Sequence, residues 1–193
     1  MKNLVLISLM GFMMLNNIGC SPVGVIAGSG AGTMVVAEGD RSLGTVVDDA
    51  TIKVNIGTQF LNSPDGLFVN VDTSVLEGRV LLTGLVDNQE IRIDAVRRVW
   101  EVEGVKEVIN EIEIGNRETL KEYANDLWIN TQAKALSIKT IGLRAMSYNF
   151  ETIKGKVYVA GLTSRPEQLD EIIEVVKNIK GVKEIVNYVI VKE

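Results

Sequence analysis

The chain alternates between segments whose apolar residues recur with a helical period and segments in which apolar and polar residues alternate. Alternation over residues 67–72, 79–86 and 106–114 predicts three strands. One helical segment precedes the first strand and another separates the second strand from the third. The apolar residues on the two helical faces are Ile52, Ile56 and Phe60 in the first, and Ala95, Val96, Val99 and Val102 in the second. From this order we expect an α/β (α+β) two-layer unit, in which two helices cover one face of a three-stranded mixed sheet.

The whole pattern recurs 77 residues later without a gap. The sequence Gly-Val-Lys-Glu, for example, stands at 104–107 and again at 181–184. We therefore expect two copies of the unit: copy one at residues 48–114 and copy two at 125–191, joined by a polar linker at 115–124. In copy two the expected strands are 144–150, 156–162 and 183–191, and the helical faces carry Ile129, Ala133, Leu136, Ile172, Ile173, Val176 and Ile179.

Three pairs of glycines are predicted to shape both copies. The first pair lies in the turns between the first two strands, where glycine tolerates a positive φ. The second pair ends the second strand, and the third pair ends the second helix as a C-terminal cap. In that order, the pairs are Gly78 and Gly155, Gly84 and Gly161, and Gly104 and Gly181.

The amino-terminal residues have the character of an export signal. The apolar run at residues 4–15 has the length of a signal-peptide core and is short for a membrane span. Beyond it, Gly19 directly before the single cysteine, Cys20, resembles a bacterial lipoprotein signal, with Asn17 where that pattern usually has leucine. The resemblance implies a signal peptide over residues 1–19, lipidation (palmitate) at Cys20 and a tether up to residue 47. An uncleaved anchor, or an ordinary signal in which the cysteine is incidental, are the alternatives.

Composition excludes several kinds of chemistry. The 20 basic and 25 acidic residues give a net charge of -5, which does not favour a nucleic-acid binder. The absence of histidine excludes an imidazole base, proton shuttle or zinc ligand, and one cysteine makes no internal disulfide or thiolate cluster. We interpret the acidic pair Asp48-Asp49 as a helix cap, and Glu111 with Glu113 as solvent-facing strand positions. We expect no enzyme activity, no metal and no cofactor.

The repeated unit resembles the BON domain. The likeness rests on a glycine at the hairpin, a glycine after the second strand, and Gly-Val-Lys-Glu-Val before the last strand of copy one. Two such units behind a lipoprotein signal, with the segments at 40–49 and 125–129, resemble in particular the dual-BON outer-membrane lipoproteins related to the division- and outer-membrane-stress-associated lipoprotein of Gram-negative bacteria. This resemblance implies phospholipid binding in the periplasm, a role in envelope integrity and no catalysis. Ser21, in place of an aspartate that resembles an inner-membrane retention signal, favours the outer membrane.

The two copies carry opposite charge. Copy one has 13 acidic and 6 basic residues, whereas copy two has 7 acidic and 9 basic residues. Copy two also has a tryptophan near the start of its first helix, where copy one has Thr51. An indole with neighbouring basic groups suits an anionic headgroup region. The predicted phospholipid-binding residues are therefore Trp128, Leu127, Lys134, Lys139 and Arg144.

Other interpretations of these residues stay open at this stage. Trp128 alternatively packs on its own sheet or on copy one, because large aromatic residues are usually mostly buried. We expect Trp100 to be buried between the copies. A second hypothesis for the whole chain is a protein-interaction adaptor, in which acidic copy one docks an envelope protein and neither copy contacts lipid. A soluble periplasmic protein is the expectation if Cys20 is not processed.

Overall fold

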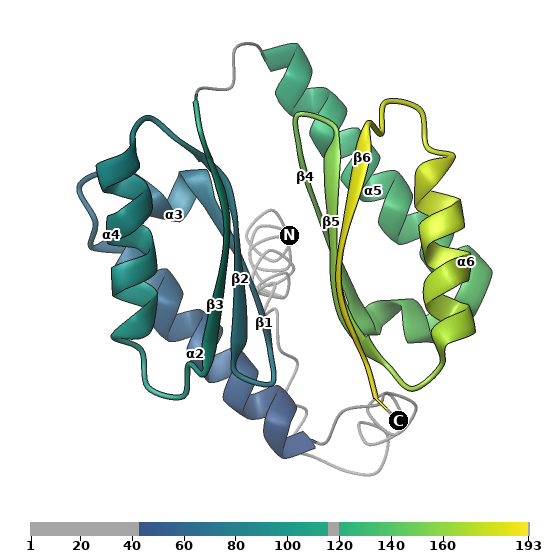
Figure 1. Ribbon diagram of the computed structural model, residues 1–193, viewed down its shortest axis with the longest axis horizontal. Coiled ribbons are helices and arrows are strands. Elements are labelled where there is room, and N and C mark those ends of the chain that lie inside the picture. Colours follow the sequence, from purple (N-terminus) through teal and green to yellow (C-terminus); the bar gives the residue numbers. More distant parts are fainter. Residues whose placement is uncertain (1–42, 116–119, 193) are drawn as a thin grey trace, which may run out of the picture. The chain divides into compact units, whose positions relative to one another are not determined.

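The structure, a computed structural model, describes residues 43–115 and 120–192 (Figure 1). The predicted signal peptide, Cys20 and most of the predicted tether lie outside the described residues. The described chain forms two units of the expected kind, each a three-stranded sheet with its own helices. The first helix of each unit begins five residues before the predicted repeat, at Leu43 in copy one and at Leu120 in copy two.

Copy one contains three strands in the spatial order β1-β2-β3. Strand β2 pairs antiparallel with β1 and parallel with β3, so the sheet is mixed, as predicted. In Figure 1, helices α2 and α4 lie on the same face of this sheet. The elements in chain order are α2 (Leu43–Leu61), α3 (Leu67–Asn70), β1 (Val71–Leu76), β2 (Arg79–Val86), α4 (Gln89–Trp100) and β3 (Glu107–Ile114).

Copy two repeats this topology, with sheet order β4-β5-β6 and the same antiparallel and parallel pairings. Helices α5 and α6 cover one face of its sheet (Figure 1). A 3-10 helix, η1, takes the place of α3. The elements are α5 (Leu120–Ile141), η1 (Gly142–Ser147), β4 (Tyr148–Ile153), β5 (Lys156–Thr163), α6 (Pro166–Lys177) and β6 (Glu184–Val191).

The predicted helical faces form the cores. Ile52, Ile56 and Phe60 are buried in one cluster with Ala95 and Val99. In copy two, the equivalent cluster contains Ile129, Ala133, Ile172 and Val176, while Leu136 is partly buried against it. Ser137 occupies the position equivalent to Phe60 and is also buried. Burial of these apolar faces against the sheets is the main term that stabilises each unit.

The predicted start of the first strand in each copy is wrong. Residues 67–70 form α3, and residues 144–147 belong to η1, so the strands begin only at Val71 and Tyr148. A short apolar run is compatible with either a strand or one helical turn, and the fully buried Leu67 decides for the turn because it fills the core below α2. The turn brings the Asn70 carbonyl oxygen against Gly84, where a Cβ would lie 2.1 Å from that oxygen.

Asp49 does not cap a helix, because α2 begins six residues earlier. Its buried carboxylate instead accepts hydrogen bonds from the backbone N–H groups of Glu77 at 2.8 Å and Gly78 at 2.9 Å. Both turn residues have positive φ, 54° and 81°, as a two-residue hairpin turn of this kind requires. The helix is thereby bonded to the hairpin, and the same arrangement recurs in copy two.

The central strands β2 and β5 are buried on both faces. The residues on the faces turned away from the helices form a third cluster drawn from both copies, with Leu81, Leu85, Ile153, Tyr158 and Ala160 buried in it. Glu111 lies at this cluster, where it accepts a hydrogen bond from the Tyr188 hydroxyl and lies 3.6 Å from the Lys156 Nζ. Glu113 is also partly buried. The interpretation of these two glutamates as solvent-facing is therefore wrong.

Candidate functional site

Helix α5 has one buried side and one broad exposed side. Asp126, Ile129, Ala133 and Ser137 face the core and are buried. Because an α-helix turns by about 100° per residue, residues three, four and seven positions apart lie on the same side, and the side opposite the core is exposed. The large apolar residues exposed there are Leu120, Leu127, Trp128 and Ile138. An apolar row pointing away from the core is unusual for a helix that already has a packed side, and such rows are typical of contact surfaces.

Trp128 lies on this exposed side with 45% of its surface accessible. The structure therefore does not bury this indole on its own sheet or on copy one, the alternative that the sequence left open. Leu127 beside it is 56% exposed. Together the two side chains offer an apolar ring, a polar N–H and a branched aliphatic group, which suits the boundary between headgroups and acyl chains.

Three exposed lysines border the apolar row. Lys121 and Lys139 are 7 residues before and 11 residues after Trp128, so both lie about 20° around the helix from it, on one border. Lys134 lies on the other border, about 20° from Leu127. We name this surface the α5 face: Leu120, Lys121, Leu127, Trp128, Lys134, Ile138 and Lys139. Lysines on both borders of an apolar stripe are typical of helices that lie in a membrane interface.

The structure brings together four of the five predicted residues. Trp128, Leu127, Lys134 and Lys139 all belong to the α5 face, whereas Arg144 lies in η1, beyond the end of α5. The rise of about 1.5 Å per residue places the end of α5 some 20 Å along the axis from Trp128. Arg144 lines a separate small cavity with Arg165 and Gln168. Lys121 was not predicted because residues 115–124 were assigned to the linker. Its spacing of two helical turns from Trp128 is a signal that could have placed it on this face.

Lys134 carries one of the charges that act on the partly buried carboxyl group of Glu151. Glu151 of β4 accepts a hydrogen bond of 3.3 Å from the Asn130 side chain, one turn before Lys134. Burial raises the pKa of Glu151 to about 7, and the charge of Asp72 adds to this effect. Lys53, Lys134 and the hydrogen bond from Asn130 act in the opposite direction. The charge beside one border of the α5 face therefore changes near neutral pH.

Helix α2 is the natural comparison for α5, since it occupies the same place in copy one. The positions equivalent to Lys121, Trp128, Lys134 and Lys139 are Gly44, Thr51, Gly57 and Asn62. Val47, Val54 and Leu61 of α2 are exposed, so an apolar row exists there too. It lacks the indole and the basic borders, which makes the α5 face a property of copy two alone.

Trp100 is also exposed, at 52%, and the expectation that it is buried between the copies is wrong. It ends α4, one residue after the fully buried Val99, so its side chain points about 100° away from the core. Ile93, two turns earlier on the same helix, is exposed as well. These two residues form a second, smaller apolar patch on acidic copy one.

Comparison with known proteins assigns the family. The family model for the BON domain matches residues 48–116 and 125–193. The chain belongs to the BON-domain family. Each match covers one copy of the repeat, so the protein carries two BON domains in tandem. Within the part of the chain that the structure describes, no helix is long and apolar enough to cross a membrane.

Three relatives cover most of this chain. An uncharacterized protein in the gshII 5' region of Anaplasma centrale is 39% identical over 76% of this chain and 96% of its own length. The outer membrane lipoprotein DolP of Haemophilus influenzae is 27% identical over 87% of this chain and 86% of its own length. The 21 kDa hemolysin of Actinobacillus pleuropneumoniae is 29% identical over 77% of this chain and 78% of its own length.

Proposed function

We propose that this protein is a non-enzymatic outer-membrane lipoprotein, anchored through Cys20 and facing the periplasm, whose α5 face binds anionic phospholipid in support of envelope integrity. The relative named an outer membrane lipoprotein supports the location, because it matches this chain over 87% of its length. The lipobox-like Gly19-Cys20 supports the anchor. The observation that carries the binding is the exposed Trp128 between lysine borders on one helix face.

The physical basis of this binding is a short-range attraction at high local concentration. A lipid anchor keeps the domains near the bilayer, so the α5 face needs only modest affinity to choose orientation and lipid. Each lysine near an anionic surface contributes about 1 kcal/mol, and salt screens this term. Burial of Trp128 and Leu127 at the headgroup level adds an apolar term that salt does not weaken.

The experiment uses Trp128 as its own reporter. With Trp100→Phe, Trp128 is the single indole of the chain, which has two tryptophans. The full chain is reconstituted in vesicles of phosphatidylcholine alone or with phosphatidylglycerol, each containing brominated lipid. We expect quenching of Trp128 in the anionic vesicles that weakens as salt is raised. Equal quenching in both compositions, or none in either, would contradict the proposal.

The adaptor function is favoured by one observation, the exposed patch of Trp100 and Ile93 on acidic copy one. In that case, crosslinking from α4 in the envelope gives one dominant protein partner, and Trp128 shows no quenching in anionic vesicles. Crosslinking from position 93 therefore separates the two functions.

A further inference from the structure

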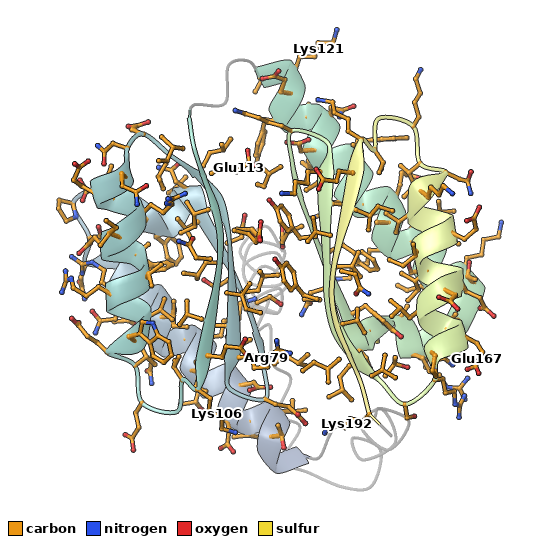
Figure 2. The ribbon with its side chains drawn as sticks, in the orientation of Figure 1. Arg79, Lys106, Glu113, Lys121, Glu167 and Lys192 are labelled. Carbon is orange, nitrogen blue, oxygen red and sulfur yellow. The ribbon has the colours of Figure 1, made fainter. Side chains whose placement is uncertain are left out.

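Copy two has a hollow of about 320 Å³ at the amino-terminal end of α5. Of its lining residues, Lys121 alone belongs also to the α5 face. The hollow lies among the first turns of α5, the turn between β4 and β5, and the segment before β6. We name it the lysine hollow, and its lining residues are Lys121, Glu122, Asn125, Asp126, Lys154 and Lys183. Figure 2 shows Lys121 at the start of α5, where it belongs both to this hollow and to a border of the α5 face.

The walls of the lysine hollow are fixed by backbone contacts. Asp126 accepts hydrogen bonds from the N–H groups of Lys154 at 2.7 Å and Gly155 at 2.9 Å. The Lys183 N–H donates to the Gly155 carbonyl at 2.8 Å, and the Lys183 Nζ donates to the Lys154 carbonyl at 2.8 Å. The turn and the Lys183 side chain are thus held in place before any ligand arrives, which lowers the entropy cost of binding one.

The acidic residues of the hollow do not cancel its positive charge. Asp126 is 4% exposed, and both of its oxygens already accept hydrogen bonds from the turn. The Asp126 carboxylate is therefore already bound to backbone N–H groups of the turn. Among the other lining residues, three lysines stand against the single carboxylate of Glu122. Lysine is a common partner of phosphate groups because it supplies a compact charge and three donors.

Copy one contains the same hollow with the opposite charge. That hollow has a volume of about 380 Å³ and forms around Asp49 in the same way. Its lining includes Asp48, Glu77 and Glu103, with Lys106 as the single lysine. The residues of copy two at the three acidic positions are Asn125, Lys154 and Lys180. The shared geometry is the product of the repeat, whereas the reversal of charge is specific to copy two.

We propose that the lysine hollow is a phosphate-binding site, in which Lys121, Lys154 and Lys183 hold the phosphate oxygens. The ligand chemistry is a phosphate group that comes either from a lipid headgroup or from a free phosphate in solution. The inference goes beyond membrane contact by the α5 face, because the hollow binds phosphate without a bilayer. Through Lys121, a phosphate in the hollow lies at the border of the α5 face.

The test is a titration of the full chain in non-ionic maltoside micelles, followed by amide NMR. Sodium phosphate is added and compared with sodium chloride at the same ionic strength. We expect saturating shifts of the Lys154, Gly155 and Lys183 amides in phosphate alone, with no such shifts at Glu77 and Gly78. Shifts of equal size in the two salts, or shifts that do not saturate, would overturn the proposal.

A matched pair of variants reverses one lysine charge in two different places. Lys154→Glu introduces the residue that copy one has at this turn, where Glu77 takes a φ of 54° and Lys154 one of 51°, so the hairpin tolerates it. We expect it to weaken phosphate binding at least tenfold. Lys177→Glu, on α6 outside both the hollow and the α5 face, is expected to change it less than twofold. Equal losses in both variants would show a general charge effect and overturn the site.

The source of the phosphate is distinguished by a second arm, in which the micelles contain phosphatidylglycerol or phosphatidylcholine. If the headgroup is the source, the hollow amides shift in the anionic micelles and added phosphate competes. If free phosphate is the source, only the titration in solution moves them. Failure of the Trp128 quenching experiment with saturable phosphate binding removes the proposed function and keeps the hollow, and the reverse result removes only the hollow.

Discussion

Asp126 of helix α5 is bonded to Gly155, 29 residues later, through a 2.9 Å hydrogen bond from the Gly155 N–H to the Asp126 Oδ1. Asp49 and Gly78 repeat this bond at 2.9 Å in copy one. In both copies, the first helix and the first hairpin therefore form one rigid corner. This corner sets the position of the α5 face relative to the sheet and forms the wall of the lysine hollow.

Loss of this carboxylate is expected to destabilise the copy that contains it. Asp126→Ala leaves one buried and one partly buried N–H group without this acceptor, and we expect a loss of about 3 kcal/mol in the free energy of unfolding. Urea titration followed by fluorescence separates the two copies in chains with a single indole. Trp100→Phe leaves Trp128 to report copy two, and Trp128→Phe leaves Trp100 to report copy one. Asp49→Ala is expected to shift the Trp100 transition instead. A loss below about 1 kcal/mol for both variants would contradict the importance of the bond.

A side chain at Gly84 is expected to disrupt copy one. A Cβ there would lie 2.1 Å from the Asn70 carbonyl oxygen, and the φ of 145° is itself unfavourable for other residues. We expect Gly84→Ala to cost more than about 2 kcal/mol. Gly142→Ala is the matched control, because its φ is 70° but no atom lies within 4 Å of the added Cβ. Its cost is expected to be about 1 kcal/mol. Equal costs would show that backbone conformation alone decides both.

The stability of copy two is expected to fall between pH 5 and pH 8. The pKa of Glu151 is about 7 in the folded protein and near 4.5 when unfolded. Between these values the folded state holds a proton that the unfolded state has lost, so stability decreases as pH rises and levels off above about 7. Urea unfolding at pH 5, 6, 7 and 8 measures this decrease. Glu151→Gln is expected to flatten it, and an unchanged slope in that variant would assign the effect to another group.

The lysines of the α5 face are expected to strengthen binding to anionic lipid one by one. Lys134→Gln is expected to weaken Trp128 quenching in phosphatidylglycerol vesicles by about fivefold in apparent affinity, the equivalent of about 1 kcal/mol. Lys177→Gln, an exposed lysine of α6, removes the same charge away from the face. If both variants weaken binding equally, net charge and not the α5 face controls it.

Lipidation is tested separately from binding. Growth with radiolabelled palmitate is expected to label the protein, and Cys20→Ala is expected to abolish the label. A chain that is processed to the size of an ordinary secreted protein without label would support the soluble periplasmic alternative. This experiment tests the anchor alone, since the α5 face lies on residues 120–141.

Much of this fold was predictable because the same sequence pattern occurs twice in the chain. The 77-residue repeat identifies the glycine turns, the helical faces and the strand order, and the buried Ile56, Val99 and Ile172 confirm the helical faces. The first strand of copy one was misjudged because the apolar run at residues 67–69, followed by alternation at 70–72, suits a strand as well as one turn of helix. Local pattern does not distinguish the two over so few residues.

The site was only partly predictable for a related reason. Periodicity placed Trp128 and Lys139 on one helix, but the helix begins at Leu120, earlier than the repeat suggested, and ends before Arg144. Lys121 was therefore not predicted as part of the α5 face, and the predicted Arg144 lies outside this face, in η1. The function of Asp49 and Asp126 depends on turns 28 and 29 residues away in the sequence, which spacing alone does not reveal. Trp100 was misplaced because size favours burial, whereas its position on α4 turns it outward.

We expect that the α5 face contacts anionic lipid and that its counterpart on α2 does not. Moving the indole between the two helices tests this difference. In chains with Trp100→Phe, Trp128 is compared with Thr51→Trp combined with Trp128→Phe, both in phosphatidylglycerol vesicles with brominated lipid. We expect strong, salt-sensitive quenching of the indole at position 128 and little at position 51. Equal quenching at the two positions, or stronger quenching at 51, would contradict it.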